Sequence, residues 1–97
     1  MATIDVTHNS SGHRFEAVVD GLLCRADYDL VDGVMRMTHT GVPSELGGRG
    51  IAAALVEAAL AHARANALKV EPWCSYVRVY MQRHPEAQPL LPEGFQL

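Results

Sequence analysis

Three glycines, Gly47, Gly48 and Gly50, carry the clearest chemical signal in this sequence. They follow a strand-like run and precede an alanine-rich run typical of a helix, residues 51–66. Glycine has no Cβ, so a ligand can approach the backbone closely there. The first turn of a helix also has unpartnered N–H groups, and its dipole favours negative charge. We therefore expect a phosphate or pyrophosphate to bind the main chain of Gly47, Gly48, Arg49, Gly50, Ile51 and Ala52.

Cys74 is the candidate nucleophile. A cysteine reacts as its thiolate, which a helix N-terminus or a nearby base stabilises. Ser75 is expected to cap a second helix, so Cys74 would lie where that dipole acts. Two other interpretations stay open, because free cysteines are often small buried apolar residues and because Cys74 could be a neighbour of the ligand without a chemical role.

Two more side chains near the glycines could take part. His39 could accept the proton of an amine, directly or through water, or could be a polar residue satisfied at a strand end. The Arg49 side chain could reach a phosphate or be solvated.

The elements that must position these residues begin with an antiparallel meander. Asp20-Gly21 and Asp32-Gly33 each separate two apolar runs, which is typical of hairpins. The expected strands are residues 4–8, 14–19, 22–31 and 34–40.

The second half changes to a helical period. The pattern predicts a helix over residues 51–66, a strand over 68–74 whose pairing ends at Pro72, a helix from 75 to 82 and an irregular tail over 88–97. Strand, glycine loop, helix and strand make a βαβ unit with parallel strands, and ligands bind beyond the carboxyl ends of such strands. We therefore expect the glycine loop, His39 and Cys74 to converge on one cleft.

Composition limits the function. With 97 residues, 48 % of them hydrophobic, the chain is expected to form a single domain over residues 1–97. The net charge of −3 and the scattered basic residues argue against nucleic acid as a partner. The sequence shows no membrane-spanning run, signal peptide or metal-ligand spacing, and two cysteines make no disulfide framework. A reduced cytoplasmic protein without a metal fits best.

The loop differs from one nucleotide-binding motif and matches another. A P-loop needs Lys followed by Ser or Thr after its last glycine, and this loop has neither. Residues 48–53 match the dinucleotide pattern GxGxxA, with Glu71 near the position of a ribose-binding acid. A dinucleotide fold, however, begins with the βαβ unit and continues into further parallel units, whereas an antiparallel meander comes first here.

The chain resembles the GNAT superfamily of acyl-CoA-dependent N-acetyltransferases. The pyrophosphate pattern of that superfamily, (Gln/Arg)-x-x-Gly-x-(Gly/Ala), is matched by residues 45–50 except that Glu45 stands first. A short single-domain branch of the superfamily is closer still, over residues 14–91. Its motifs correspond here to His39-Thr40-Gly41-Val42-Pro43, Pro72-Trp73-Cys74-Ser75-Tyr76-Val77 and His84-Pro85-Glu86.

The resemblance implies an α+β GNAT-like fold, acetyl-CoA or CoA as the bound cofactor, and transfer of an acetyl group to an unidentified amine. The pantetheine arm would follow the strand edge from Thr40 to Val42, with the acyl group approaching Cys74. In GNAT enzymes a tyrosine near the position of Tyr80 can reprotonate the CoA thiolate, although Tyr80 could equally be a core aromatic. Two alternatives remain: a non-catalytic CoA-binding or protein-interaction module, and a nucleotide-binding half-domain.

Overall fold

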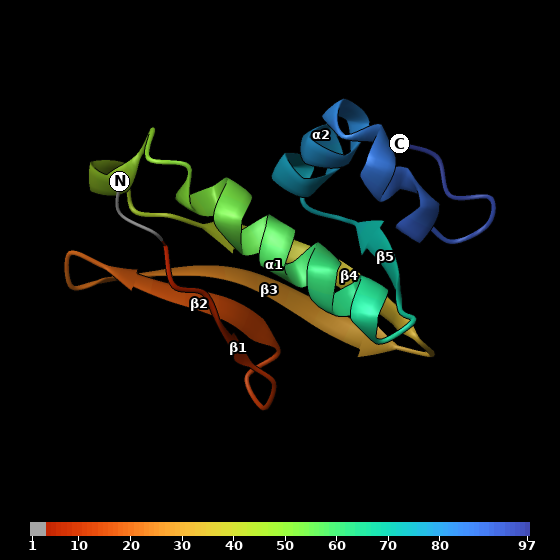
Figure 1. The fold of residues 1–97 in the computed structure, drawn as a ribbon, viewed down its shortest axis with the longest axis horizontal. Coiled ribbons are helices and arrows are strands. Elements are labelled where there is room, and N and C mark those ends of the chain that lie inside the picture. The colour runs from red at the N-terminus through yellow and green to blue at the C-terminus, as the bar shows by residue number, and fades with distance from the viewer. Residues whose placement is uncertain (1–3) are drawn as a thin grey trace.

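A five-stranded sheet forms one layer of the molecule and helices form the other (Figure 1). The computed structural model describes residues 4–97. The strands are β1 (Thr7–Asn9), β2 (Arg14–Val19), β3 (Leu22–Val31), β4 (Val34–Gly41) and β5 (Lys69–Pro72). The α-helices are α1 (Ile51–Ala65) and α2 (Ser75–Arg83), and the short 3₁₀ helices are η1 (Ser44–Leu46) and η2 (Pro85–Leu90).

The sheet order follows the sequence, β1-β2-β3-β4-β5. The first four strands pair antiparallel, and β5 pairs parallel with β4 after the crossover through α1. This arrangement confirms the predicted α+β, GNAT-like fold with a meander, a βαβ unit and a following helix. The two Asp-Gly turns have positive φ at both residues, for example 52° at Asp20 and 76° at Gly21, as tight hairpins of this kind require.

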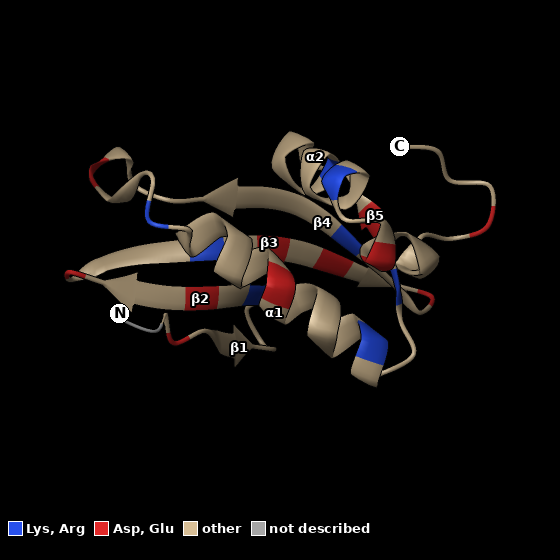
Figure 2. Cartoon of the chain, turned by 45° about the horizontal axis from the view of Figure 1, so that its top comes forward, with Lys and Arg blue, Asp and Glu red and all other residues tan. Residues whose placement is uncertain are grey.

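One face of the sheet is buried and the other is open. Alternate residues of β2 to β4, such as Phe15, Ala26 and Met35, pack under α1 in the core. α2 lies beside α1, over β4 and β5, and buries Val77 and Met81 in the same core. The strand residues that alternate with these core residues point to the opposite face of the sheet. Figure 2 shows that charged residues recur along β2, β3 and β4.

A bulge in β4 separates two differently paired halves of that strand. Met37 lies opposite Tyr28, and His39 lies opposite the preceding residue, Asp27, so Thr38 is an extra residue in β4. Pairing with β3 continues to Gly41, whereas pairing with β5 ends at Met37 and Pro72. The edge of β4 over residues 38–41 therefore has no strand on its β5 side among the described residues.

Three expected boundaries were wrong. Residues 4–6 are not part of a strand, and β1 begins at Thr7. β5 is shorter than residues 68–74, because the chain turns away after Pro72, where pairing was expected to end. Part of the tail expected to be irregular belongs to η2, which buries Ala87 and Leu90. No helix in residues 4–97 is long and apolar enough to cross a membrane.

Candidate functional site

The glycine loop forms a hollow at the start of α1. Gly48 and Gly50 have φ of 79° and 76°, a backbone conformation that residues with a Cβ rarely adopt. Within residues 4–97 no side chain caps α1, so the N–H groups of its first turn are left for another acceptor. The hollow has a volume of about 300 Å³ and is lined by residues 42–44, 46–53 and Tyr76. A Cβ on Gly48 or Gly50 would project into open space rather than into the protein. This loop therefore fits an anionic group lying close to its backbone.

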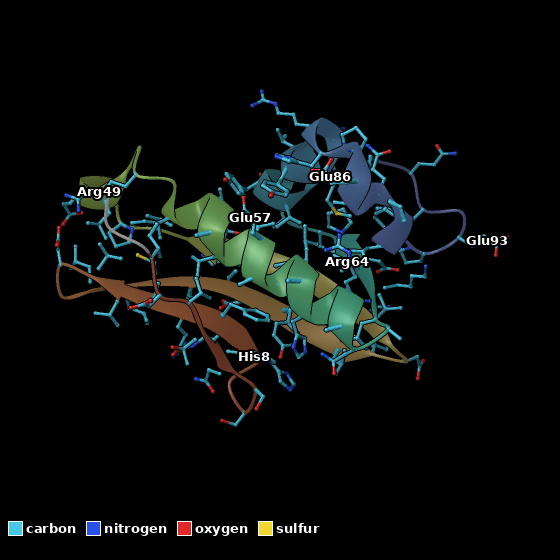
Figure 3. The ribbon with its side chains drawn as sticks, in the orientation of Figure 1. His8, Arg49, Glu57, Arg64, Glu86 and Glu93 are labelled. Atoms are coloured by element: carbon cyan, nitrogen blue, oxygen red, sulfur yellow. The ribbon has the colours of Figure 1, made fainter. Side chains whose placement is uncertain are left out.

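The Arg49 side chain is exposed to solvent and also forms an ion pair with a neighbouring turn. Its guanidinium donates to the Asp20 carboxylate in the β2–β3 turn, with an N–O distance of 2.8 Å. In Figure 3, Arg49 lies at the end of the molecule where the loop meets that turn. Both side chains are exposed, so this ion pair contributes little to stability.

Cys74 lies across the gap between β4 and α2. Its Sγ is 3.5 Å from the hydroxyl oxygen of Thr40, on the helix-covered side of the sheet. Burial acts to raise the pKa of the Cys74 thiol, but hydrogen bonds from Thr40 and from the backbone N–H groups of Val77 and Tyr76 outweigh it, and the pKa lies below its ordinary value. The start of α2 therefore favours the Cys74 thiolate, whereas burial alone raises the pKa of Cys24, in the core.

His39 lies on the other face of the sheet. Strict alternation from Met35 and Met37 would turn it toward α1, but the extra residue Thr38 reverses the faces, so His39 shares the open face with Asp27. There it lines a shallow hollow of about 340 Å³ with Leu23, Arg25 and residues 41–43. The expectation that His39 joins the loop and Cys74 in one cleft was therefore wrong: Thr40 and Cys74 adjoin the loop, and His39 faces away from them.

The Tyr80 hydroxyl points into a groove between α1 and α2. It donates to the Glu57 carboxylate at 3.2 Å, and its ring stacks on His84. Figure 3 shows Glu57 on the part of α1 that faces α2. Burial, together with Glu57, raises the pKa of Tyr80 to about 12. The groove of about 210 Å³ around Tyr80 does not include Cys74.

Tyr76 is the residue that sequence reasoning missed. It lines both the hollow of the glycine loop and the groove next to Tyr80. Its position in the first turn of α2, directly after Cys74, was the available signal. Ala52 and Ala53 also line the hollow of the glycine loop, where their small side chains take up little space. Within residues 4–97, no group of three or more His, Cys, Asp and Glu side chains could hold a metal ion.

Two comparisons with known proteins agree with this geometry. The family model for GCN5-related N-acetyl-transferases matches residues 14–90. The solution structure of a candidate GCN5-like N-acetyltransferase from Staphylococcus aureus superposes with a TM-score of 0.75 at 28 % sequence identity. That match covers 99 % of this chain and 94 % of the other.

Proposed function

This chain belongs to the GCN5-related N-acetyltransferase family, and from that premise we propose that it binds acetyl-CoA and transfers the acetyl group to a primary amine. The observation that carries the proposal is the free edge of β4 over residues 38–41, which begins where β5 turns away and leads to the glycine loop. An extended pantetheine arm could bond to this edge as an added strand would.

The residues of the glycine loop fit the pyrophosphate of the same acetyl-CoA molecule. The pyrophosphate would accept hydrogen bonds from main-chain N–H groups of residues 47–52, where Gly48 and Gly50 leave room beside the backbone. With the arm on residues 40–42, the thioester would lie beside Thr40 and Cys74. The pyrophosphate loop and the acyl position are thus joined by one continuous stretch of backbone.

The amine would reach the acetyl group from the open face, where His39 lies. Its nitrogen attacks the carbonyl carbon, the bond from that carbon to the CoA sulfur breaks, and CoA leaves as a thiolate. The proton of the attacking nitrogen passes to His39 through water, because the His39 side chain faces away from Thr40 and Cys74. Transfer depends mainly on holding the two reactants in this geometry.

Two steps of this route have alternatives. The acetyl group could first move to the Cys74 thiolate and then to the amine, which would leave a thioester on Cys74 in between. Tyr80 remains a candidate for returning a proton to the CoA thiolate, and Tyr76, which lines the loop hollow, is the second candidate. We place the reaction in the cytoplasm, since both cysteines are free.

Ligand-dependent melting tests the cofactor. CoA and acetyl-CoA should stabilise the protein, by about 2.7 kcal/mol at a hundredfold excess over Kd. NAD and ATP should shift the melting temperature much less. Equal shifts from all of these ligands would contradict acyl-CoA recognition.

Release of the CoA thiol, measured with and without a panel of amines, tests the transfer. Release that depends on the amine supports the enzyme. Binding of CoA without turnover would favour the second candidate, a CoA-binding module, for which the shallow form of the hollow at His39 is the supporting observation.

A further inference from the structure

A cluster of aromatic rings joins β1 to α1, away from the glycine loop. His8 of β1 is at its centre: its ring stacks on Phe15 of β2 with 4.3 Å between centroids, and its Nε2 is 2.6 Å from the hydroxyl oxygen of Tyr28 on β3. The same ring meets His62 of α1 edge to face, with 4.4 Å between centroids. Figure 3 shows His8 far from Arg49 in the glycine loop, so the cluster takes no part in the proposed transfer.

β1 is a short strand at the edge of the sheet. Its three residues pair with β2 alone, and the first of them, Thr7, is exposed. The Asn9 side chain bonds to Glu16 and to the β1–β2 turn. His8 is therefore the residue of β1 whose side chain reaches α1. Since short edge segments open locally at little cost in free energy, a modest change at His8 is enough to detach β1 from α1.

The surroundings of His8 disfavour a positive charge. Phe15 and Tyr28 are neutral, and His62 would carry a charge of the same sign when protonated. Within residues 4–97 no carboxylate forms an ion pair with a histidine. Burial, and then the neighbouring His62, hold the pKa of His8 below its ordinary value.

The charged residues of the neighbouring elements face elsewhere. On β2 and β3 they alternate with the core residues and lie on the open face of the sheet. These are Arg14, Glu16, Arg25, Asp27 and Asp29. On α1, Glu57 and Arg64 line a groove on the side of α2, and Asp5, which precedes β1, is exposed. His13, in the β1–β2 turn, stacks on Tyr28 with 5.5 Å between centroids and is the third histidine of the cluster.

We infer that the contact between His8 and His62 is an acid-sensitive clasp, which holds β1 against α1 at neutral pH and releases it when the imidazoles take up protons. Because the pKa of His8 is lower with the clasp closed, the clasp is fully formed above the ordinary histidine pKa of about 6.5 and weakens as the pH falls below it. Release exposes the edge of β2 and leaves the pairing of β2 to β5 in place. The inference goes beyond the proposed transfer and does not depend on it.

Hydrogen exchange of the backbone amides tests the clasp. It is followed by NMR at about pH 7.5 and about pH 5.5, on either side of the histidine pKa, and corrected for the intrinsic effect of pH. In acid the protection of the amides that bond β1 to β2 should fall at least about tenfold, and that of the β3–β4 amides should change less than about twofold. Equal protection of the β1–β2 amides at the two pH values would overturn the inference. So would a uniform loss over the whole sheet, which would mean acid unfolding of the domain rather than release of β1.

Two variants separate the charge from the packing. His8→Phe keeps a ring on Phe15 but takes up no proton, so the β1–β2 amides should keep their protection in acid. His84→Phe is the matched control, since it replaces a histidine that stacks on Tyr80 at the far end of α2, and its acid response should equal that of the wild type. A full acid response in His8→Phe contradicts the clasp, as does the loss of that response in His84→Phe.

His62→Phe keeps the inference testable if His8→Phe already loses protection at neutral pH. It leaves His8 and its contact with Tyr28 in place and removes the second charge. The loss of β1–β2 protection in acid should then be smaller than in the wild type. An unchanged loss in His62→Phe overturns the inference.

Discussion

The two halves of β4 share one strand but differ in what surrounds them. Before the bulge, Met35 and Met37 are fully buried, and the strand is paired on both sides. After the bulge, residues 38–41 pair with β3 alone, and the strand presents Thr40 to Cys74 on one face and His39 to solvent on the other. One extra residue, Thr38, thus converts a core strand into an edge with different chemistry on its two faces.

The largest loss of activity is expected from a substitution of His39, on the open face of the sheet. His39→Gln removes the imidazole that we propose accepts the amine proton, so kcat should fall at least about 100-fold. CoA-induced stabilisation should be unchanged, because His39 lies on the face opposite Cys74. A near-normal kcat in His39→Gln would mean that another group accepts the proton of the amine.

A smaller effect, on CoA affinity, is expected from the glycine loop that follows the free edge of β4. Gly48→Ala and Gly50→Ala add a methyl group in the hollow, which should weaken CoA binding at least about tenfold, or 1.4 kcal/mol. The methyl group also strains a backbone with positive φ, at a cost of about 1–2 kcal/mol in the free energy of unfolding.

Gly33→Ala is the matched control for this strain. Gly33 has φ of 76° and open space around its Cβ position, as Gly50 does, but it lies in the β3–β4 turn. Isothermal titration of the three variants with CoA should therefore separate a shared loss of stability from a loss of affinity confined to the loop. Full affinity in both loop variants would mean that the pyrophosphate binds elsewhere.

The smallest effect is expected at the ion pair that joins the loop to the β2–β3 turn. Asp20→Asn frees the Arg49 guanidinium to turn toward a bound phosphate, and exposed pairs of this kind are worth about 1 kcal/mol or less. CoA affinity should rise by no more than about fivefold and return to the wild-type value in high salt. The same change in an Arg49→Gln background should have no effect. A lower affinity for CoA in Asp20→Asn would instead indicate that the pair holds the loop in its binding shape.

The elements could be predicted from the sequence because their signals are local. The Asp-Gly pairs set the hairpins, the apolar period of residues 51–66 matches α1 to within one residue, and Pro72 ends the pairing of β5. The parallel pairing of β4 and β5 follows from the βαβ order.

The face of the sheet on which each site residue lies could not be predicted in the same way. A bulge leaves no clear mark in a sequence, and a shift of one residue reverses every side chain that follows it. The side of the sheet on which His39 lies could therefore not be predicted from the sequence. The contacts of Tyr80 with Glu57, of Arg49 with Asp20 and of Trp73 with Arg36 join segments far apart in the chain, and only the fold brings them together.

The rate at which Cys74 is alkylated, with and without saturating CoA, tests the central claim that the cofactor lies along the free edge of β4. In the free protein the lowered pKa of this half-buried thiol should make Cys74 react at lower pH than an ordinary cysteine, with the rate rising as pH rises through that pKa. Cys24, which is fully buried and has a raised pKa, should stay unmodified in the folded protein and serve as the internal control. The account predicts that bound CoA protects Cys74, because the pantetheine thiol would lie beside it. Alkylation of Cys74 at the same rate with and without CoA would contradict the account.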